Sequence, residues 1–264
     1  MKDNGLNARW AAGQSALGLW LSGAGAAATE TLAELRYDYI NIDMQHGMID
    51  YGDVVPLLTS LQGSGATLTA RVPWNEPGII GKVLDAGVQG VIIPMVNTVA
   101  EAEAATRACR YAPVGSRSYG PIRAARSLGP DYYAEANDKI VCIPMIETVE
   151  ALSNLDAILD VPGIDAVYVG PADLSISLGL PPGSNNDDDS FQDALKAILD
   201  GCAKRGIAAG IHSDTTWAPV RLEQGFTMVT ITSDTQAMAQ GAADALRAVT
   251  DAAPGAGGGG DSMY

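Results

Sequence analysis

The feature that most constrains the fold is a regular alternation between short apolar runs and longer segments with helical periodicity. Eight runs rich in Val, Ile and Ala have the length of buried strands, at residues 16–21, 39–42, 67–71, 90–93, 141–146, 166–169, 208–211 and 228–231. Helical segments separate them, among them 24–35, 76–86, 98–109, 149–159, 191–205 and 235–249. Unbroken apolar strands that alternate with helices are typical of a parallel sheet buried on both faces.

Local signals support several of these helices. Thr98, with Glu101 three residues later, matches the capping-box pattern at a helix start. Glycines lie where three helices should end before the next strand, at Gly87, Gly206 and Gly225. Eight strand–helix units predict a single closed (β/α)8 TIM barrel, which needs about 250 residues, and the chain has 264.

The alternative fold is a doubly wound open sheet. That fold would place a GxGxxG motif after the first strand, together with a suitably spaced acidic residue. The sequence there is only weakly similar and lacks the acidic partner, with Gly23-Ala24-Gly25-Ala26-Ala27. We therefore expect one barrel domain over residues 1–253, followed by a flexible glycine-rich tail at 254–264.

Charge and hydropathy exclude several classes of partner. The 16 Lys and Arg residues against 31 Asp and Glu give a net charge of −15, and such an acidic surface repels nucleic acid. No apolar run approaches the roughly 20 residues of a membrane span, and the N-terminus lacks a signal-peptide pattern. We therefore expect a cytoplasmic protein without membrane contact. Reduced, buried thiols are expected at Cys109, Cys142 and Cys202, which lack CxxC spacing.

Two connections are unusually long, at 111–138 and 171–190. Connections of this length usually cover a site. The second contains an acidic triplet at 187–189, which would suit a cation but more often begins a helix and faces water. We expect the triplet to begin a helix.

In a (β/α)8 barrel, side chains at the carboxyl ends of the strands meet at one mouth, where catalysis takes place. Both histidines of the chain follow predicted strands. Polar or aromatic residues end the strands in chain order, at Trp20, Asp43 with His46, Arg71, Glu147, Asp173, His212 and Asp234.

Glu147 and Asp173 follow consecutive strands, so their carboxylates should approach each other. Two ionised carboxylates repel unless a shared proton, an arginine or a metal neutralises them. An oxygen-only pair with open positions suits Mg²⁺ or Mn²⁺. The alternative is that Glu147 pairs with a loop arginine and Asp173 caps a turn.

Arg71 and His46 are the candidate charged and acid–base groups. Arg71 ends a buried strand and needs an anionic partner, either a substrate oxygen or a salt bridge inside the barrel. His46 follows Asp43 by three residues, and an imidazole with a carboxylate on its second nitrogen is a good general base. The alternative is an ordinary hydrogen-bonded loop histidine.

Schiff-base chemistry would need a lysine at the mouth. None of the five lysines follows a predicted strand; they are Lys2, Lys82, Lys139, Lys196 and Lys204. If this barrel stabilises carbanions, we expect it to use a metal ion.

These residues resemble the HpcH/HpaI aldolase family, the metal-dependent pyruvate aldolases of the phosphoenolpyruvate/pyruvate barrel superfamily. The resemblance extends from about residue 18 to residue 249. It rests on Gly18-Leu19-Trp20, Asp43-x-x-His46-Gly47, Ala70-Arg71-Val72-Pro73, Leu84-Asp85-Ala86-Gly87, Ile93-Pro94-Met95-Val96, Ile146-Glu147-Thr148 and Gly170-Pro171-Ala172-Asp173-Leu174-Ser175.

The resemblance implies a class II aldolase, a lyase that cleaves 4-hydroxy-2-oxo acids to pyruvate or hydroxypyruvate and an aldehyde. Glu147 and Asp173 would hold Mg²⁺, Mn²⁺ or Co²⁺, and the backbone near Ala172 and Asp173 would help to bind the 2-oxo acid. Members of the family are commonly hexameric, so a homo-oligomer is expected.

The resemblance also implies the roles of the other groups. Arg71 would stabilise the enolate oxygen, His46 would be the acid–base group, and Asp85 would raise the basicity of His46. The substrate would further contact Trp20 and Met145. His212, from its position after a strand, is expected to recognise or protonate a polar group on the acceptor side of the substrate.

Three positions depart from the family pattern, namely Gln45, Met145 and His212. They leave the metal and enolate groups intact but change the surroundings of the substrate. Two other functions remain as alternatives. A citrate-lyase β-like enzyme acting on a CoA ester would want a basic patch, and a non-catalytic barrel subunit would have a broken site.

Overall fold

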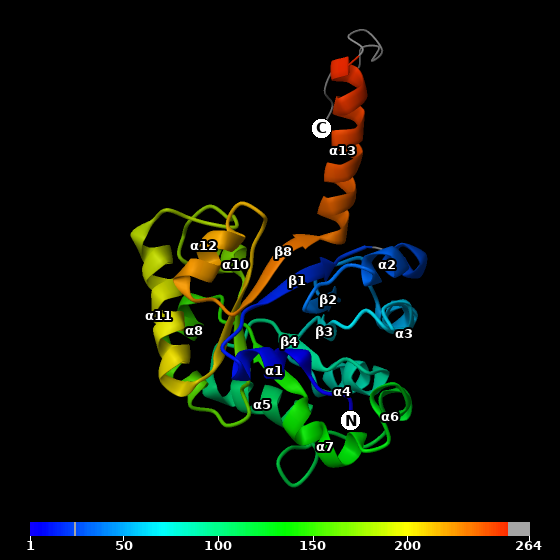
Figure 1. The fold of residues 1–264 in the computed structure, drawn as a ribbon. Coiled ribbons are helices and arrows are strands. Elements are labelled where there is room, and N and C mark those ends of the chain that lie inside the picture. The colour runs from blue at the N-terminus through cyan, green and yellow to red at the C-terminus, as the bar shows by residue number, and fades with distance from the viewer. Residues whose placement is uncertain (24, 253–264) are drawn as a thin grey trace.

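Eight parallel strands form one sheet that curves into a barrel in the computed structural model of the chain (Figure 1). The structure describes residues 1–23 and 25–252, so the predicted tail at 254–264 lies outside the described residues. The strands are β1 Ala16–Leu21, β2 Tyr39–Asp43, β3 Thr67–Arg71, β4 Gly90–Ile93, β5 Val141–Pro144, β6 Ala166–Val169, β7 Ala208–His212 and β8 Met228–Ser233.

The sheet order is β5-β4-β3-β2-β1-β8-β7-β6, and a single bridge between Met145 and Tyr168 joins its two ends. This is the nearly closed (β/α)8 barrel expected from the sequence, and the fold prediction is confirmed. The strand β5 ends at Pro144 rather than at residue 146, because beyond it only the Met145–Tyr168 bridge continues the ladder.

Helices surround the sheet. They are α1 Gly5–Ala11, α2 Ala26–Ala33, α3 Tyr51–Ser60, α4 Pro77–Ala86, α5 Val99–Cys109, α6 Ile122–Leu128, α7 Tyr132–Lys139, α8 Val149–Ser153, α9 Leu155–Leu159, α10 Pro171–Ser177, α11 Asp189–Arg205, α12 Ala218–Gln224 and α13 Asp234–Ala252. The segment predicted as one helix at 149–159 is two, and Asn154 at the junction donates its side-chain amide to the Asn97 carbonyl (2.9 Å).

The predicted helix ends are observed. Thr98 and Glu101 form the capping box of α5, and Gly87 closes α4 in the left-handed conformation (φ 109°). That conformation suits glycine because it has no Cβ. The acidic triplet begins α11, where the Asp188 carboxylate accepts a hydrogen bond from the Ser190 amide (2.9 Å).

Two tyrosines fill the barrel interior. A Cβ at Gly18 would lie 2.0 Å from the Tyr39 ring, and one at Gly210 would lie 2.5 Å from the Tyr168 ring. The two glycines therefore leave the space that the rings occupy. Both tyrosine hydroxyls form hydrogen bonds with the Thr230 hydroxyl, at 2.8 and 2.6 Å. A buried polar network inside the barrel is satisfied in this way.

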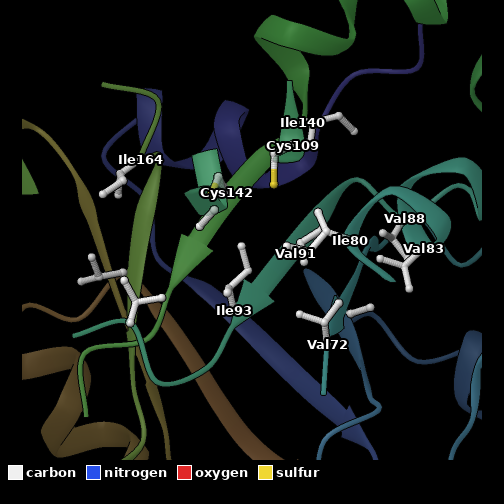
Figure 2. Close-up of a cluster of buried hydrophobic side chains, with 14 of the residues drawn as sticks. Val72, Ile80, Val83, Val88, Val91, Ile93, Cys109, Ile140, Cys142 and Ile164 are labelled. Atoms are coloured by element: carbon white, nitrogen blue, oxygen red, sulfur yellow. The ribbon is translucent and has the colours of Figure 1, made fainter. Parts of the chain in front are cut away.

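The larger hydrophobic core lies between the strands and the helices. Figure 2 shows part of it, where side chains from β4 and β5 meet those of α4 and α5. Cys109 and Cys142 belong to this core, and Cys202 is likewise buried; all three are free thiols, as predicted.

The two long connections differ in location. The 111–138 segment folds into α6 and α7 and bonds to the N-terminal arm, where the Lys2 amide donates to the Leu128 carbonyl (2.5 Å). None of its residues lines the cavity at the strand ends, so it does not cover that site. The 171–190 segment does, through Gly183 and Ser184.

The last helix, α13, extends away from the barrel in the view of Figure 1, where it is orange to red. Three large apolar side chains along it are more than half exposed, Met238, Leu246 and Val249. Within the described ranges, no helix has both the length and the apolar character that a bilayer span requires.

Candidate active site

A cavity of about 210 Å³ lies at the carboxyl ends of the strands. It collects most of the predicted site residues, together with Tyr168 and Ser184, which the sequence did not indicate. Its lining residues are Trp20, His46, Arg71, Met145, Tyr168, Gly170, Pro171, Ala172, Asp173, Gly183, Ser184 and His212. No lysine is among these lining residues of the described chain, in agreement with the prediction.

Glu147 has a buried carboxyl group with a raised pKa. Its side chain is buried, its Oε1 accepts a hydrogen bond from the Met95 amide (2.9 Å), and its Oε2 has no hydrogen-bond partner within the described residues. Burial raises the pKa of Glu147 to about 7 and the charge of Asp173 adds to this, against the Met95 amide and Arg71, which lower it. A buried carboxylate oxygen without a partner is costly, so this atom is set up to meet a proton or a cation.

The free oxygen of Glu147 points at the backbone that begins α10. A Cβ added to Gly170 would lie 2.2 Å from Glu147 Oε2, so only a glycine fits between this oxygen and the helix. Asp173 lies in the first turn of α10 and lines the cavity. The Met145–Tyr168 bridge joins the chain segments that lead to Glu147 and Asp173, and Glu147, unlike Asp173, is not among the residues that line the cavity.

Arg71 makes one of the two contacts that the sequence left open, the salt bridge inside the barrel, and it also lines the cavity. Its Nε and Nη2 donate to Asp43 Oδ1 and Oδ2, at 2.9 and 2.6 Å, and its guanidinium lies over the Trp20 ring, 5.0 Å from the centroid. A paired and oriented guanidinium avoids the cost of a lone buried charge, and Nη1 of Arg71 has no hydrogen bond among the described residues.

Asp43 acts differently from the expectation. Burial opposes its ionisation, but hydrogen bonds and charge from Arg71, followed by the Trp20 side chain, lower its pKa overall. It also accepts the backbone amides of Gln45 and His46, at 3.1 and 3.3 Å. Asp43 therefore holds Arg71 and the start of the His46 loop, and does not bind the imidazole. Direct pairing of Asp43 with Arg71 in the β2–β3 register is the signal that indicates this role.

His46 and Asp85 are not brought together in the chain. His46 is exposed and lines the cavity, and no hydrogen bond of the described residues involves its ring. Asp85 lies on α4, where its Oδ1 accepts a hydrogen bond from Arg117 Nη2 (2.6 Å). The expectation that Asp85 supports His46 is therefore not met within one chain, because Arg117 holds the Asp85 carboxylate.

His212 lies at the cavity, as its position after a strand predicted. Its ring meets the Trp20 ring edge-on, with centroids 4.9 Å apart. Burial lowers the pKa of His212 to about 4, with help from the charge of Arg71 and against Asp43 and Asp214. The imidazole is therefore neutral at neutral pH.

The family follows from a comparison with known proteins. The HpcH/HpaI aldolase/citrate lyase family model matches residues 16–241, which include every strand of the barrel. The chain belongs to this family. The family membership inferred from the motifs is thereby confirmed.

Two relatives of this HpcH/HpaI family member are named as aldolases. The chain is 41% identical to the hydroxypyruvate/pyruvate aldolase of Rhizorhabdus wittichii over 244 residues, which cover 92% of this chain and 96% of the relative. It is 37% identical to the 4-hydroxy-2-oxo-heptane-1,7-dioate aldolase of Klebsiella pneumoniae over 235 residues, 88% of each chain. A solved HpcH/HpaI family structure from Burkholderia cenocepacia superposes with a TM-score of 0.87 at 30% identity, covering 93% of this chain and 99% of the other. The chain is an enzyme of the aldolase class, as predicted.

Proposed function

We propose that the protein is a divalent-metal-dependent aldolase that reversibly cleaves 4-hydroxy-2-oxo acids to pyruvate or hydroxypyruvate and an aldehyde. The observation that carries the proposal is the buried Oε2 of Glu147, which has no hydrogen-bond partner among the described residues and whose carboxyl group senses the charge of Asp173. The names of the relatives from Rhizorhabdus wittichii and Klebsiella pneumoniae support the substrate class.

The residues present fit a divalent cation. Glu147 and Asp173 would hold it, since both offer carboxylate oxygens and Glu147 Oε2 has no hydrogen-bond partner in the described part of the chain. Among the described residues no cluster of three or more His, Cys, Asp or Glu side chains could form a closed metal site. Two protein oxygens with open positions suit Mg²⁺, Mn²⁺ or Co²⁺. When bound, the cation supplies Lewis-acid stabilisation of the negative charge that develops on the substrate oxygen.

Groups of the chain itself would bind the substrate carboxylate, stabilise the enolate oxygen and exclude water. The first-turn amides of Ala172 and Asp173 have no partner within α10 and can seat the substrate carboxylate. Arg71 lines the cavity and keeps its charge there, and it stabilises the enolate oxygen that forms as the C3–C4 bond breaks. Trp20 and Met145 exclude water from the reacting carbons.

The proposed acid–base group is His46. Retro-aldol cleavage takes the proton from the C4 hydroxyl, breaks the C3–C4 bond and leaves its electron pair in the enolate of the 2-oxo acid. An exposed imidazole at the edge of the cavity can accept that proton, directly or through one water, and return it to C3. The Asp85 carboxylate, which the family resemblance pairs with this ring, accepts a hydrogen bond from Arg117 in this chain.

The metal requirement is tested by measuring pyruvate release from a 4-hydroxy-2-oxo acid. We expect EDTA to abolish the release and Mg²⁺, Mn²⁺ or Co²⁺ to restore it, whereas EDTA saturated beforehand with Mg²⁺ should have no effect. Activity that survives complete chelation and is trapped by borohydride would contradict the proposal, because borohydride traps an imine on lysine.

A homo-oligomer, and by family resemblance a hexamer, is the proposed quaternary state. Its support in the structure is α13, which extends from the barrel with Met238, Leu246 and Val249 exposed. Apolar side chains gathered on an exposed helix usually mark an interface. Light scattering at micromolar concentration should give a mass that is a multiple of the 27.3 kDa chain, and a monomer mass would contradict this.

A further inference from the structure

One wall of the cavity is aromatic. It is made by Trp20 of β1, Tyr168 of β6 and His212 of β7. The Trp20 and Tyr168 rings are stacked with centroids 5.5 Å apart, and His212 packs edge-on against Trp20 at 4.9 Å. This packing fixes the orientation of the imidazole, so any polar group that it presents is preorganised.

Two of the three polar groups in this wall are already engaged. The Tyr168 hydroxyl forms a hydrogen bond with the Thr230 hydroxyl (2.6 Å), and the Trp20 side chain interacts with the Asp43 carboxylate. Over the described residues no hydrogen bond involves either ring nitrogen of His212. The imidazole is therefore the polar group of this wall that remains for a ligand.

The chemistry of this imidazole points to a hydroxyl group. Because the ring stays neutral, one nitrogen donates a hydrogen bond and the other accepts one. A hydroxyl both donates and accepts, whereas a second carboxylate on the substrate would need a cation. The nearest guanidinium, Arg71, has two of its nitrogens bound to Asp43.

The position of the wall indicates which carbon of the substrate would bear this hydroxyl. Arg71, which would stabilise the oxygen on C2 in the proposed reaction, lies directly over Trp20. Trp20 in turn contacts His212. With the C2 oxygen at Arg71, a substituent on C3, one bond away, would come within reach of the wall that contains the imidazole.

We propose that His212 is a specificity-determining residue, which favours 2-oxo acids with a hydroxyl on C3, such as hydroxypyruvate, over pyruvate. This inference rests on the proposed aldolase function and deepens it by naming the residue that selects the 2-oxo acid. An apolar residue at this position would leave the C3 hydroxyl without a partner in a largely apolar wall.

The test is the ratio of kcat/KM for hydroxypyruvate to kcat/KM for pyruvate, each added to the same unsubstituted aliphatic aldehyde by the metal-loaded protein. We expect His212→Leu to lower this ratio about tenfold, the usual worth of one hydrogen bond to a buried group. His212→Gln, which keeps a donor and an acceptor, should hold the ratio within about threefold of the original. His212→Ala replaces His212→Leu if the latter does not fold, with the same expected fall.

The outcomes separate the two proposals. A ratio unchanged in both apolar variants, or lowered equally in His212→Gln, would overturn the role of His212 while the aldolase function stands. A wild-type protein that joins neither 2-oxo acid to the aldehyde would overturn the proposed function and this inference with it.

Discussion

Replacement of Glu147 by glutamine should remove almost all aldolase activity and at the same time stabilise the cation-free protein. A bound cation contributes several kcal/mol of transition-state stabilisation, so we expect kcat/KM to fall roughly a thousandfold. Glutamine retains an oxygen for the Met95 amide, so the local backbone should be preserved.

The gain in stability follows from the raised pKa of Glu147, about 7 against its ordinary value of 4.5. Between these pH values the folded carboxyl binds a proton that the unfolded one has lost. Its contribution to stability is therefore complete below pH 4.5 and is lost as the pH rises through 7. The largest effect of Glu147→Gln is thus above pH 7, where it should raise the free energy of unfolding by up to about 3 kcal/mol.

The measurement is urea unfolding in EDTA between pH 5 and 8.5, together with kcat/KM at saturating Mn²⁺. The matched control is Glu150→Gln, which removes an exposed carboxylate three residues further along and should change neither quantity appreciably. Wild-type activity in Glu147→Gln, or the same loss of stability with rising pH as in the wild type, would contradict the assigned environment of Glu147.

The fold could be predicted from the sequence because its signals are local. Four of the strands, β1, β3, β4 and β6, match the apolar runs at both ends, since buried parallel strands need no alternation of polar residues. The caps at Thr98 and Gly87 are equally local. Helices such as α6 and α10, seven residues each, were not identified because they are too short for a clear periodicity.

Many of the residues that line the cavity could be predicted from the sequence, but the hydrogen bonds and salt bridges between the site residues could not. Which residues reach the mouth follows from strand ends, and the cavity contains Arg71, Asp173 and His212 as expected. Which groups pair depends on the path of the connections. Arg117, which holds Asp85, comes from the long connection at 111–138, whose course had no signal in the sequence.

The second large effect is expected from a substitution that changes no charge. Gly170→Ala would place a methyl group 2.2 Å from Glu147 Oε2, in the space where a cation must approach. The backbone of Gly170 is extended (φ −93°), so alanine itself is not strained there. We expect the variant to fold and to lose cation binding and activity by a factor of a hundred or more, roughly the effect of losing one ligand contact.

Gly81→Ala is the matched control for this variant. Gly81 lies in α4 with no heavy atom within 4 Å of an added Cβ, so the same methyl group meets open space. Alanine is also the better helix former. The control should keep full activity and be slightly more stable, and equal losses in both variants would argue against a specific role for the space beside Gly170.

The most direct measurement is Mn²⁺ binding to the chelator-treated protein, followed by electron paramagnetic resonance of the free ion. We expect one Mn²⁺ per chain in the wild type and in Gly81→Ala, and none at the same concentrations in Glu147→Gln, Asp173→Asn or Gly170→Ala. Binding that is unchanged in all three variants would show that the carboxylates of Glu147 and Asp173 do not hold the ion, and the proposed mechanism would fail.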